Sequence, residues 1–192
     1  MIKNKDRSKW FGASDTHFIM GKWNTKTFAK WWSVKLGLIQ NNFSTISTIA
    51  GNEYEHRIAN AISERINEDL ILDRQIKCRK YRVRVNLDSE TKSTIYEIKT
   101  FKAVDDWKPT KSYEMQLQVQ MYFAKKKGCI VAYPLEEENY RNLFIPVEKE
   151  KLLFFNYDLD KSFIKKYLQR VKYLKKCLIK GKLPNLKEME NE

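Results

Sequence analysis

The feature that constrains this chain most is a pair of extended runs, residues 75–87 and 94–101, on either side of the polar residues 88–92. Side chains of the first run alternate between apolar and basic in the order Tyr81, Arg82, Val83, Arg84 and Val85. This period of two is typical of a strand with one apolar face. Two such runs joined by a polar turn predict a hairpin, whose apolar face must be covered by other elements.

Apolar residues at helical spacing, on both sides of the hairpin, can supply that cover. The predicted helices are a short one ending at residue 20, followed by residues 25–36, 52–69, 113–127 and 161–180. Residues 70–73 and 75–87 together are predicted to be an extended or hairpin region, and further short strands are predicted at residues 129–133 and 142–147. This order predicts an α/β (α+β) fold in which helices flank a small mixed β-sheet. Residues 1–184 are expected to form a single domain, with a polar tail at residues 185–192.

The charge of the chain indicates the class of its partner. Lys and Arg number 37 against 24 Asp and Glu, so the formal net charge is +13. This excess excludes an acidic solvating protein and favours a polyanion, most simply nucleic acid. No apolar run approaches the roughly 20 residues of a membrane helix, and no secretory signal is visible, so no membrane association is expected. Three distant cysteines without a CxxC pair are typical of the reducing cytoplasm.

The extended run at residues 94–101 carries a candidate metal site. Its period of two places Glu97 and Lys99 on one face, and an acid and a base are costly to bury in an apolar strand without a role. Asp88 stands at the start of the preceding turn, where a bent hairpin can bring its carboxylate beside Glu97. Two carboxylates and a lysine suit Mg²⁺ or Mn²⁺ and an attacking water. The alternative is a solvated edge strand with a Glu–Lys surface pair.

Two predicted helices add further polar candidates. Glu55 shares a stripe with apolar residues of its helix, which favours an inward position. On the helix after the hairpin, Gln118 and Tyr122 share one face, whereas Gln116 and Gln120 share roughly the opposite one. Only one of these pairs can face a site on the sheet, and the spacing does not decide which. The alternative is a solvent-exposed polar face.

The order of these motifs resembles the core of the PD-(D/E)XK nucleases. Asp88 followed by Glu97-Ile98-Lys99 is similar to their metal-binding motif. Residues 51–55, GNEYE, resemble the G-x-x-x-E signature that ends here at Glu55, and residues 118–122, QVQMY, resemble the Q-x-x-x-Y signature of RecB-type members. Residues 11–15, FGASD, resemble the G-(G/A)-S-(D/E) opening of YqaJ-type viral recombinases, the lambda-exonuclease type. That group has an arginine seven residues before its serine, as Arg7 stands before Ser14.

The resemblance implies a restriction-endonuclease-like core and a Mg²⁺-dependent deoxyribonuclease, with Mn²⁺ as a substitute and no iron–sulfur cluster. It implies in particular a phage-type 5′→3′ exonuclease that resects duplex DNA ends for recombination in the cytoplasm of a bacterial host. The expected partners are double-stranded DNA ends and a single-strand annealing protein, and a homo-oligomer is left open. The alternatives are a structure-specific or restriction-like endonuclease, such as a junction resolvase, and a non-catalytic DNA-binding or inhibitor protein on the same fold.

The resemblance also implies roles for individual residues. Asp88 and Glu97 would hold the metal, with the Ile98 carbonyl and Glu55 as further ligands. Lys99 would activate the nucleophile, and Gln118 would orient near the metal site. The residues expected to contact DNA are Arg7, Ser14, Tyr122 and Gln116.

Overall fold

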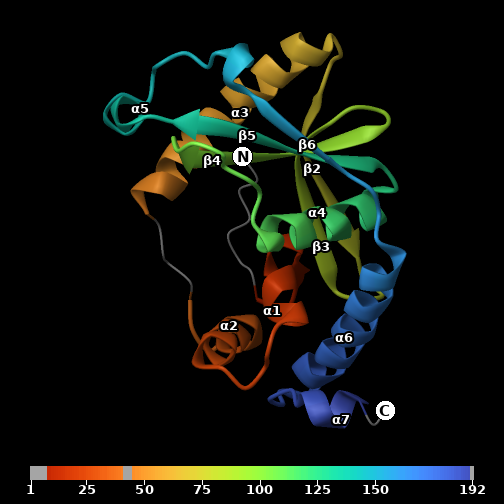
Figure 1. Cartoon of the computed structure of the whole chain (residues 1–192). Helices are drawn as coiled ribbons and strands as arrows, with labels where there is room; N and C mark the ends of the chain where they lie inside the picture. Colours follow the sequence, from red (N-terminus) through yellow and green to blue (C-terminus); the bar gives the residue numbers. More distant parts are fainter. Residues whose placement is uncertain (1–7, 41–44, 191–192) are drawn as a thin grey trace.

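A six-stranded mixed sheet forms the centre of the molecule, in the order β1-β3-β4-β5-β6 with β2 paired to β3 (Figure 1). The computed structural model describes residues 8–40 and 45–190, so Arg7 lies outside the described residues. The strands are β1 (Phe11–Gly12), β2 (Ile71–Cys78), β3 (Val83–Glu90), β4 (Thr94–Lys102), β5 (Lys127–Leu135) and β6 (Leu153–Tyr157). The predicted mixed sheet flanked by helices is confirmed.

Strand β3 organises the sheet because both of its edges are used. Strand β2 pairs antiparallel along the length of β3 on one edge. On the other edge, β1 pairs in parallel with Val83 and Arg84, whereas β4 pairs antiparallel with Ser89 and Glu90. Two strands therefore share this edge, and among the described strands none covers its middle, residues 85–88.

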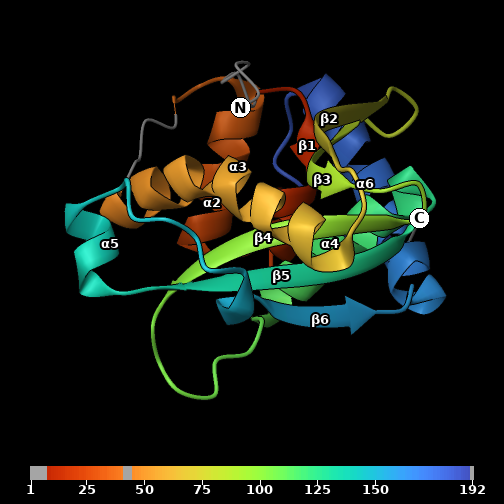
Figure 2. The same ribbon diagram turned by 90° about the horizontal axis from the view of Figure 1, so that it is seen from above.

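Helices cover both faces of the sheet. Helix α3 (Ile46–Ile66) and the short α5 (Glu137–Arg141) lie over one face, and Figure 2 shows α3 in front of β4 and β5. The other face is covered by α1 (Thr16–Met20), α2 (Lys26–Leu36), α4 (Lys111–Ala124) and α6 (Lys161–Lys180). Strand β5 serves both cores, because Cys129 and Val131 pack with α3 whereas Ile130 packs with the α4 side.

Capping residues in the sequence fix the ends of the helices. The Thr25 hydroxyl accepts a hydrogen bond from the Phe28 N–H at 3.1 Å, and Gly37, with φ of +77°, ends α2. Asp160 caps α6 in the same way, accepting from the backbone N–H groups of its first turn. The predicted helices at residues 25–36 and 161–180 are thereby confirmed to within one residue.

Helix α6 ties the N-terminal helices to the rest of the fold. Its Arg170 guanidinium donates to the backbone carbonyls of Ile19 and Gly21, at 3.0 Å each. The residues after it, expected as a polar tail, contain helix α7 (Leu186–Glu190), whose Leu186 and Met189 pack against the core. No helix in the described ranges 8–40 and 45–190 is both long enough and apolar enough to cross a membrane.

Several predicted boundaries are wrong. The region at residues 70–87, predicted to be extended or a hairpin, is a hairpin of β2 and β3 with a turn at residues 79–82. Strand β3 continues to Glu90, however, so Asp88 lies within a strand rather than in the predicted turn. The strand predicted at residues 142–147 is not formed. Its Leu143 and Ile145 carbonyls instead accept hydrogen bonds from the Arg57 guanidinium, which satisfies backbone groups that a sheet would otherwise pair.

The sixth strand and the start of helix α3 also differ from the prediction. The last strand is predicted at residues 142–147, but the strand that pairs antiparallel with β5 is β6, which begins at Leu153. Helix α3 begins at Ile46, six residues earlier than predicted, because the Thr45 hydroxyl accepts from the Thr48 N–H at 3.1 Å and caps it.

Candidate active site

Strand β4 diverges from β3 directly after the turn that joins them, and the Asp88 side chain reaches across the opening between the two strands. The Ile98 N–H donates to Asp88 Oδ2 at 2.9 Å, so a carboxylate replaces the carbonyl that a neighbouring strand would supply. The N–H and C=O of one residue in an extended strand point to the same side. The Ile98 carbonyl therefore also faces the Asp88 side of β4.

A cavity of about 310 Å³ lies at this opening. It is lined by seven residues that the sequence singled out: Ser14, Glu55, Asp88, Glu97, Ile98, Lys99 and Gln116. Its lining comes from β1 and the loop after it, from α3, β3 and β4, and from the start of α4. The gap between β1 and β4 on one edge of β3 thus explains why segments distant in sequence meet at this place.

Hydrogen bonds from three side chains hold the Glu97 carboxylate, which is 2% exposed. Its Oε1 accepts from Gln116 Nε2 at 2.5 Å and from Lys99 Nζ. Its Oε2 accepts from Gln120 Nε2, which also donates to the Asn86 carbonyl at 3.1 Å. Because both partners of Gln120 are acceptors, its NH₂ group must point toward them. Gln120 therefore bridges β3 and β4 where they diverge.

The structure corrects the expected positions of Gln118 and Tyr122. The Gln118 amide donates to the Asp158 carbonyl and accepts from the Asp160 N–H, at 2.7 Å each. It holds the start of α6, on the face of α4 opposite to Glu97. Tyr122 lies on that side too and packs edge-on against Phe123. Of the two possible pairs on α4, the one that faces Glu97 is Gln116 and Gln120, and Gln116 also lines the cavity.

A buried ion pair fixes the loop that carries Ser14. The Asp15 carboxylate accepts from the Gly12 N–H at 2.7 Å and from Trp31 Nε1 at 3.0 Å, and it lies 2.6 Å from Lys35 Nζ. Lys35 is 2% exposed. Because removing one partner of a buried pair is costly, this pair specifies the loop conformation, and the exposed Ser14 is held at the cavity.

Close packing of α3 on the sheet brings Glu55 to the cavity. A side chain at Gly51 would place its Cβ 3.1 Å from Thr100 Oγ1 on β4, which is tighter than an ordinary contact. Glycine thus lets the helix approach β4. Glu55, one turn further along α3, consequently lines the same cavity as Asp88 and Glu97.

Two carboxyl groups that line this cavity, Asp88 and Glu55, have a raised pKa. Burial, followed by the neighbouring Glu97, raises the pKa of Asp88 well above its usual value. Burial and the nearby Asp73 and Glu97 likewise raise the pKa of Glu55. Burial and neighbouring acids therefore both disfavour the ionised form of Asp88 and Glu55 in the metal-free protein.

Lys99 is the cation nearest to these acids. Burial alone would lower the pKa of Lys99, but Glu97 and Asp88 outweigh burial and raise it above the usual 10.5. Its side chain is consequently an ammonium group at neutral pH in the metal-free protein. Lys99 Nζ also lies 5.1 Å from the centroid of the Tyr113 ring, which favours the charged form.

The donor set fits a hard divalent cation. Asp88, Glu97 and Glu55 offer carboxylate oxygens, and the Ile98 carbonyl faces Asp88. Oxygen donors are the ligands that Mg²⁺ and Mn²⁺ prefer in proteins. The raised pKa values of Asp88 and Glu55 agree with this fit, because a bound cation would relieve their repulsion.

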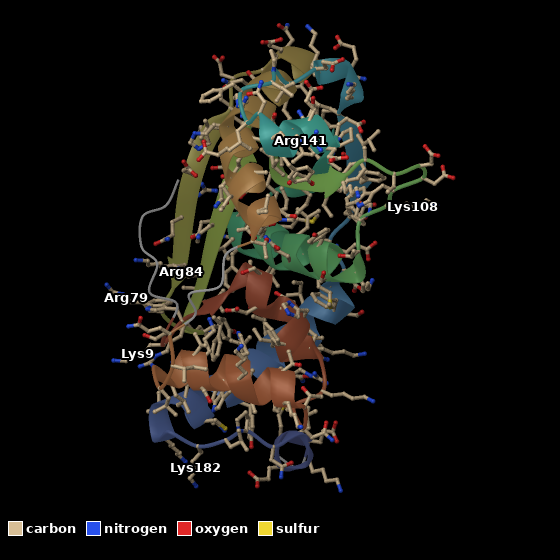
Figure 3. The ribbon with its side chains drawn as sticks, turned by 90° about the vertical axis from the view of Figure 1, so that its left-hand side faces the viewer. Lys9, Arg79, Arg84, Lys108, Arg141 and Lys182 are labelled. Atoms are coloured by element: carbon tan, nitrogen blue, oxygen red, sulfur yellow. The ribbon has the colours of Figure 1, made fainter. Side chains whose placement is uncertain are left out.

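Sequence reasoning missed several residues of the site. Gln120 was recognised only as the partner of Gln116 on one helical face, and nothing in its spacing showed which face is inward. Arg84 lines the cavity and is buried, although its alternation with apolar residues placed it on the basic face of the run. Figure 3 shows Arg84 on the same flank of the molecule as Arg79 and Lys9. Three basic side chains therefore lie on this flank, one of them in the cavity lining.

Comparison with known proteins shows where this fold occurs. No model of a known protein family matches the chain, and no curated protein matches it in sequence. Among solved structures, the alkaline exonuclease LHK-Exo from Laribacter hongkongensis superposes with a TM-score of 0.70 at 15% identity, covering 96% of this chain and 92% of that one. LHK-Exo in complex with dAMP also has a TM-score of 0.70, at 16% identity, covering 95% and 91%.

A phage-related exonuclease from Haemophilus somnus is also similar. Its TM-score is 0.62 at 12% identity, and the match covers 90% of this chain and 96% of that one. The chain therefore has the nuclease fold of these exonucleases, in agreement with the fold that the PD-(D/E)XK resemblance implied.

Proposed function

We propose that this protein is a Mg²⁺-dependent deoxyribonuclease, specifically a phage-type 5′→3′ exonuclease that resects duplex DNA ends for recombination. The observation that carries the proposal is the convergence of Asp88, Glu97, Lys99 and Glu55 in one cavity of a nuclease fold. The net charge of +13 and the basic flank with Arg84 support a nucleic acid as the substrate.

The residues divide the hydrolysis of a phosphodiester between them. A metal held by Asp88, Glu97, Glu55 and the Ile98 carbonyl would lower the pKa of a water molecule and neutralise phosphate charge. The Lys99 ammonium orients the attacking oxygen and offsets the negative charge that develops on the phosphate. Gln116 and Gln120 hold the Glu97 carboxylate in place throughout.

The products of each cleavage step follow from binding of the 5′ end of the DNA. Attack of water on phosphorus with rupture of the P–O3′ bond leaves a 3′-hydroxyl on the released nucleotide and keeps the attacked phosphate on the shortened strand. If the scissile bond is the one after the terminal nucleotide, the shortened strand thus has a 5′-phosphate for the next cycle. The 3′ overhang that accumulates is the substrate that a single-strand annealing protein would take.

A comparison of linear and circular duplex DNA tests this function. With Mg²⁺, the protein is expected to release mononucleotides from linear duplex, leaving single strands, and to leave covalently closed circles intact. With a chelator, neither substrate should change. Nicked or linearised circles would show an endonuclease instead, and DNA binding without cleavage in any divalent metal would show a non-catalytic binder.

Recognition of the DNA end predicts a preference for a terminal phosphate. Ser14 lines the cavity, and Arg7 precedes it by seven residues in the sequence. A terminal phosphate carries more charge than an internal one and offers more acceptor oxygens to such residues. We expect faster degradation of 5′-phosphorylated than of 5′-hydroxyl duplex, and a smaller difference in Ser14→Ala and Arg7→Ala. Equal rates on both substrates, or a preference for 3′ ends, would contradict the assigned polarity.

The bridge made by Gln120 predicts an effect on metal affinity. Replacing Gln120 with leucine removes both donors that hold Glu97 Oε2 and the Asn86 carbonyl. Loss of such a supporting hydrogen bond typically weakens metal binding about 10- to 100-fold. Calorimetric titration with Mn²⁺ measures the change. The matched control is Gln118→Leu on the opposite face of α4, which should lower the melting temperature but keep the Mn²⁺ affinity.

A further inference from the structure

A second group of possible metal ligands lies at the edge of the cavity. Glu55 and His56 are consecutive residues of α3, and Asp73 lies on the adjoining strand β2. One ligand atom from each of the three lies within 4.8 Å of the others. His56 Nε2 is 2.9 Å from Asp73 Oδ2, and the His56 side chain is 49% exposed. An ion could therefore reach these ligands from solvent.

The charge around this group favours a cation. Glu55 and Asp73 belong to a cavity lining with five carboxylates and three cations, in a protein of net charge +13; the other carboxylates are Asp15, Asp88 and Glu97, and the cations are Lys35, Arg84 and Lys99. A cation between Glu55 and Asp73 would offset the like charges of these two carboxylates, as a cation between Asp88 and Glu97 would on the other side of Glu55.

The chemistry of the ligands distinguishes the two positions. Asp88 and Glu97 offer only oxygen, which suits Mg²⁺, whereas His56 adds an imidazole nitrogen, which suits Zn²⁺ and other transition metals. Three protein ligands with a fourth position open to water is a common arrangement for Zn²⁺. Tetrahedral ligands at about 2.0–2.1 Å from Zn²⁺ stand about 3.3 Å from each other, so side-chain rotations suffice to close this group around an ion.

We propose that Glu55, His56 and Asp73 form a second metal site, selective for transition metals such as Zn²⁺, and that an ion bound there inhibits the nuclease by withdrawing Glu55 from Asp88 and Glu97. The inhibition rests on the nuclease function proposed above, whereas the binding does not. Because Glu55 belongs to both sites, occupation of the second site lowers the affinity of the first for Mg²⁺.

Metal binding is measured first, without DNA. The parent protein and all variants carry Cys78→Ser, so that this half-buried thiol does not contribute to metal binding. Calorimetry with Zn²⁺, and the visible absorption of Co²⁺ as a spectroscopic substitute, are compared in the parent protein, His56→Ala and His17→Ala. Loss of a ligand should weaken Zn²⁺ binding at least about tenfold in His56→Ala, because even supporting residues have effects of that size. His17→Ala, which replaces the other of the two histidines, should bind Zn²⁺ like the parent.

Two further variants separate the second site from the first. Asp88→Asn should keep the Zn²⁺ affinity, whereas Asp73→Asn should lose it. Zn²⁺ binding that persists in His56→Ala but disappears in Asp88→Asn would overturn the proposal, because the ion would then lie at the Asp88–Glu97 position. Equal Zn²⁺ affinity in the parent and in His56→Ala would also overturn it.

Inhibition is then measured as cleavage of linear duplex in Mg²⁺ with increasing Zn²⁺. The parent should lose activity over the Zn²⁺ range in which calorimetry shows binding, and His56→Ala should require at least about tenfold more. Unchanged sensitivity in His56→Ala would refute the inhibitory role. If no protein cleaves DNA but Zn²⁺ binding still depends on His56, the nuclease proposal fails and the second site stands.

Discussion

Lys99→Ala is expected to lower the rate of DNA cleavage at least about a hundredfold while DNA affinity stays within a few-fold of wild type. Lys99 Nζ contacts the Glu97 carboxylate in the cavity, but it is one cation among many in a chain of net charge +13. Its loss should therefore be felt in the transition state, where charge develops, rather than in ground-state attraction to DNA. Single-turnover cleavage and equilibrium binding in Ca²⁺ measure the two quantities separately.

The variant Lys99→Arg shows which property of the lysine matters. The raised pKa of Lys99 indicates an ammonium group rather than a base in the metal-free protein. If the positive charge is what the reaction needs, Lys99→Arg should recover part of the rate lost in Lys99→Ala, although its geometry differs. A rate in Lys99→Ala close to wild type would exclude Lys99 from the mechanism.

Asp88→Asn is expected to lower the rate of Mg²⁺-dependent cleavage at least about a thousandfold. The reason is that metal-ion stabilisation of the transition state contributes several kcal/mol. The substitution keeps the size of the side chain but removes the charge that would hold the cation. Titration with Mn²⁺ should show a large loss of affinity. Unchanged affinity and stoichiometry would show that the metal lies elsewhere.

The same substitution is expected to stabilise the metal-free protein. Because burial and Glu97 raise the pKa of Asp88, the folded protein binds more protons than the unfolded chain above pH 3.8, and its stability falls as the pH rises. Asparagine removes this contribution, so Asp88→Asn should melt at a higher temperature than wild type at neutral pH with a chelator. Part of the pH dependence should persist, because the pKa of Glu55 is also raised. Added Mg²⁺ should raise the melting temperature of wild type only.

Local patterns predicted the acidic part of the site. The period of two on β4 placed Glu97 and Lys99 on one face, and the helical stripe of α3 placed Glu55 inward. Both inferences depend only on the geometry of a single element. They hold because burying a charged side chain among apolar neighbours is costly, which makes such a residue visible in the sequence.

The parts that were not predicted depend on contacts between elements. Which pair of glutamines faces Glu97 is set by the rotation of α4 on the sheet, and Gln118 fixes that rotation by holding the loop before α6. Residues 142–147 are mostly apolar, as β6 is, but the Arg57 guanidinium binds two of their carbonyls, those of Leu143 and Ile145. No local propensity contains either interaction.

The hydrogen bonds from Arg170 to the carbonyls around α1 have a consequence for folding during synthesis. They join positions 151 and 149 residues apart, and contacts of such separation form late in folding. During synthesis, Asp88 and Glu97 leave the ribosome well before α6 does. The helix that follows Ser14, α1, therefore gains the support of α6 only after α6 has been synthesised. A chain synthesised only as far as β6 thus lacks the contacts that hold the segment next to Ser14.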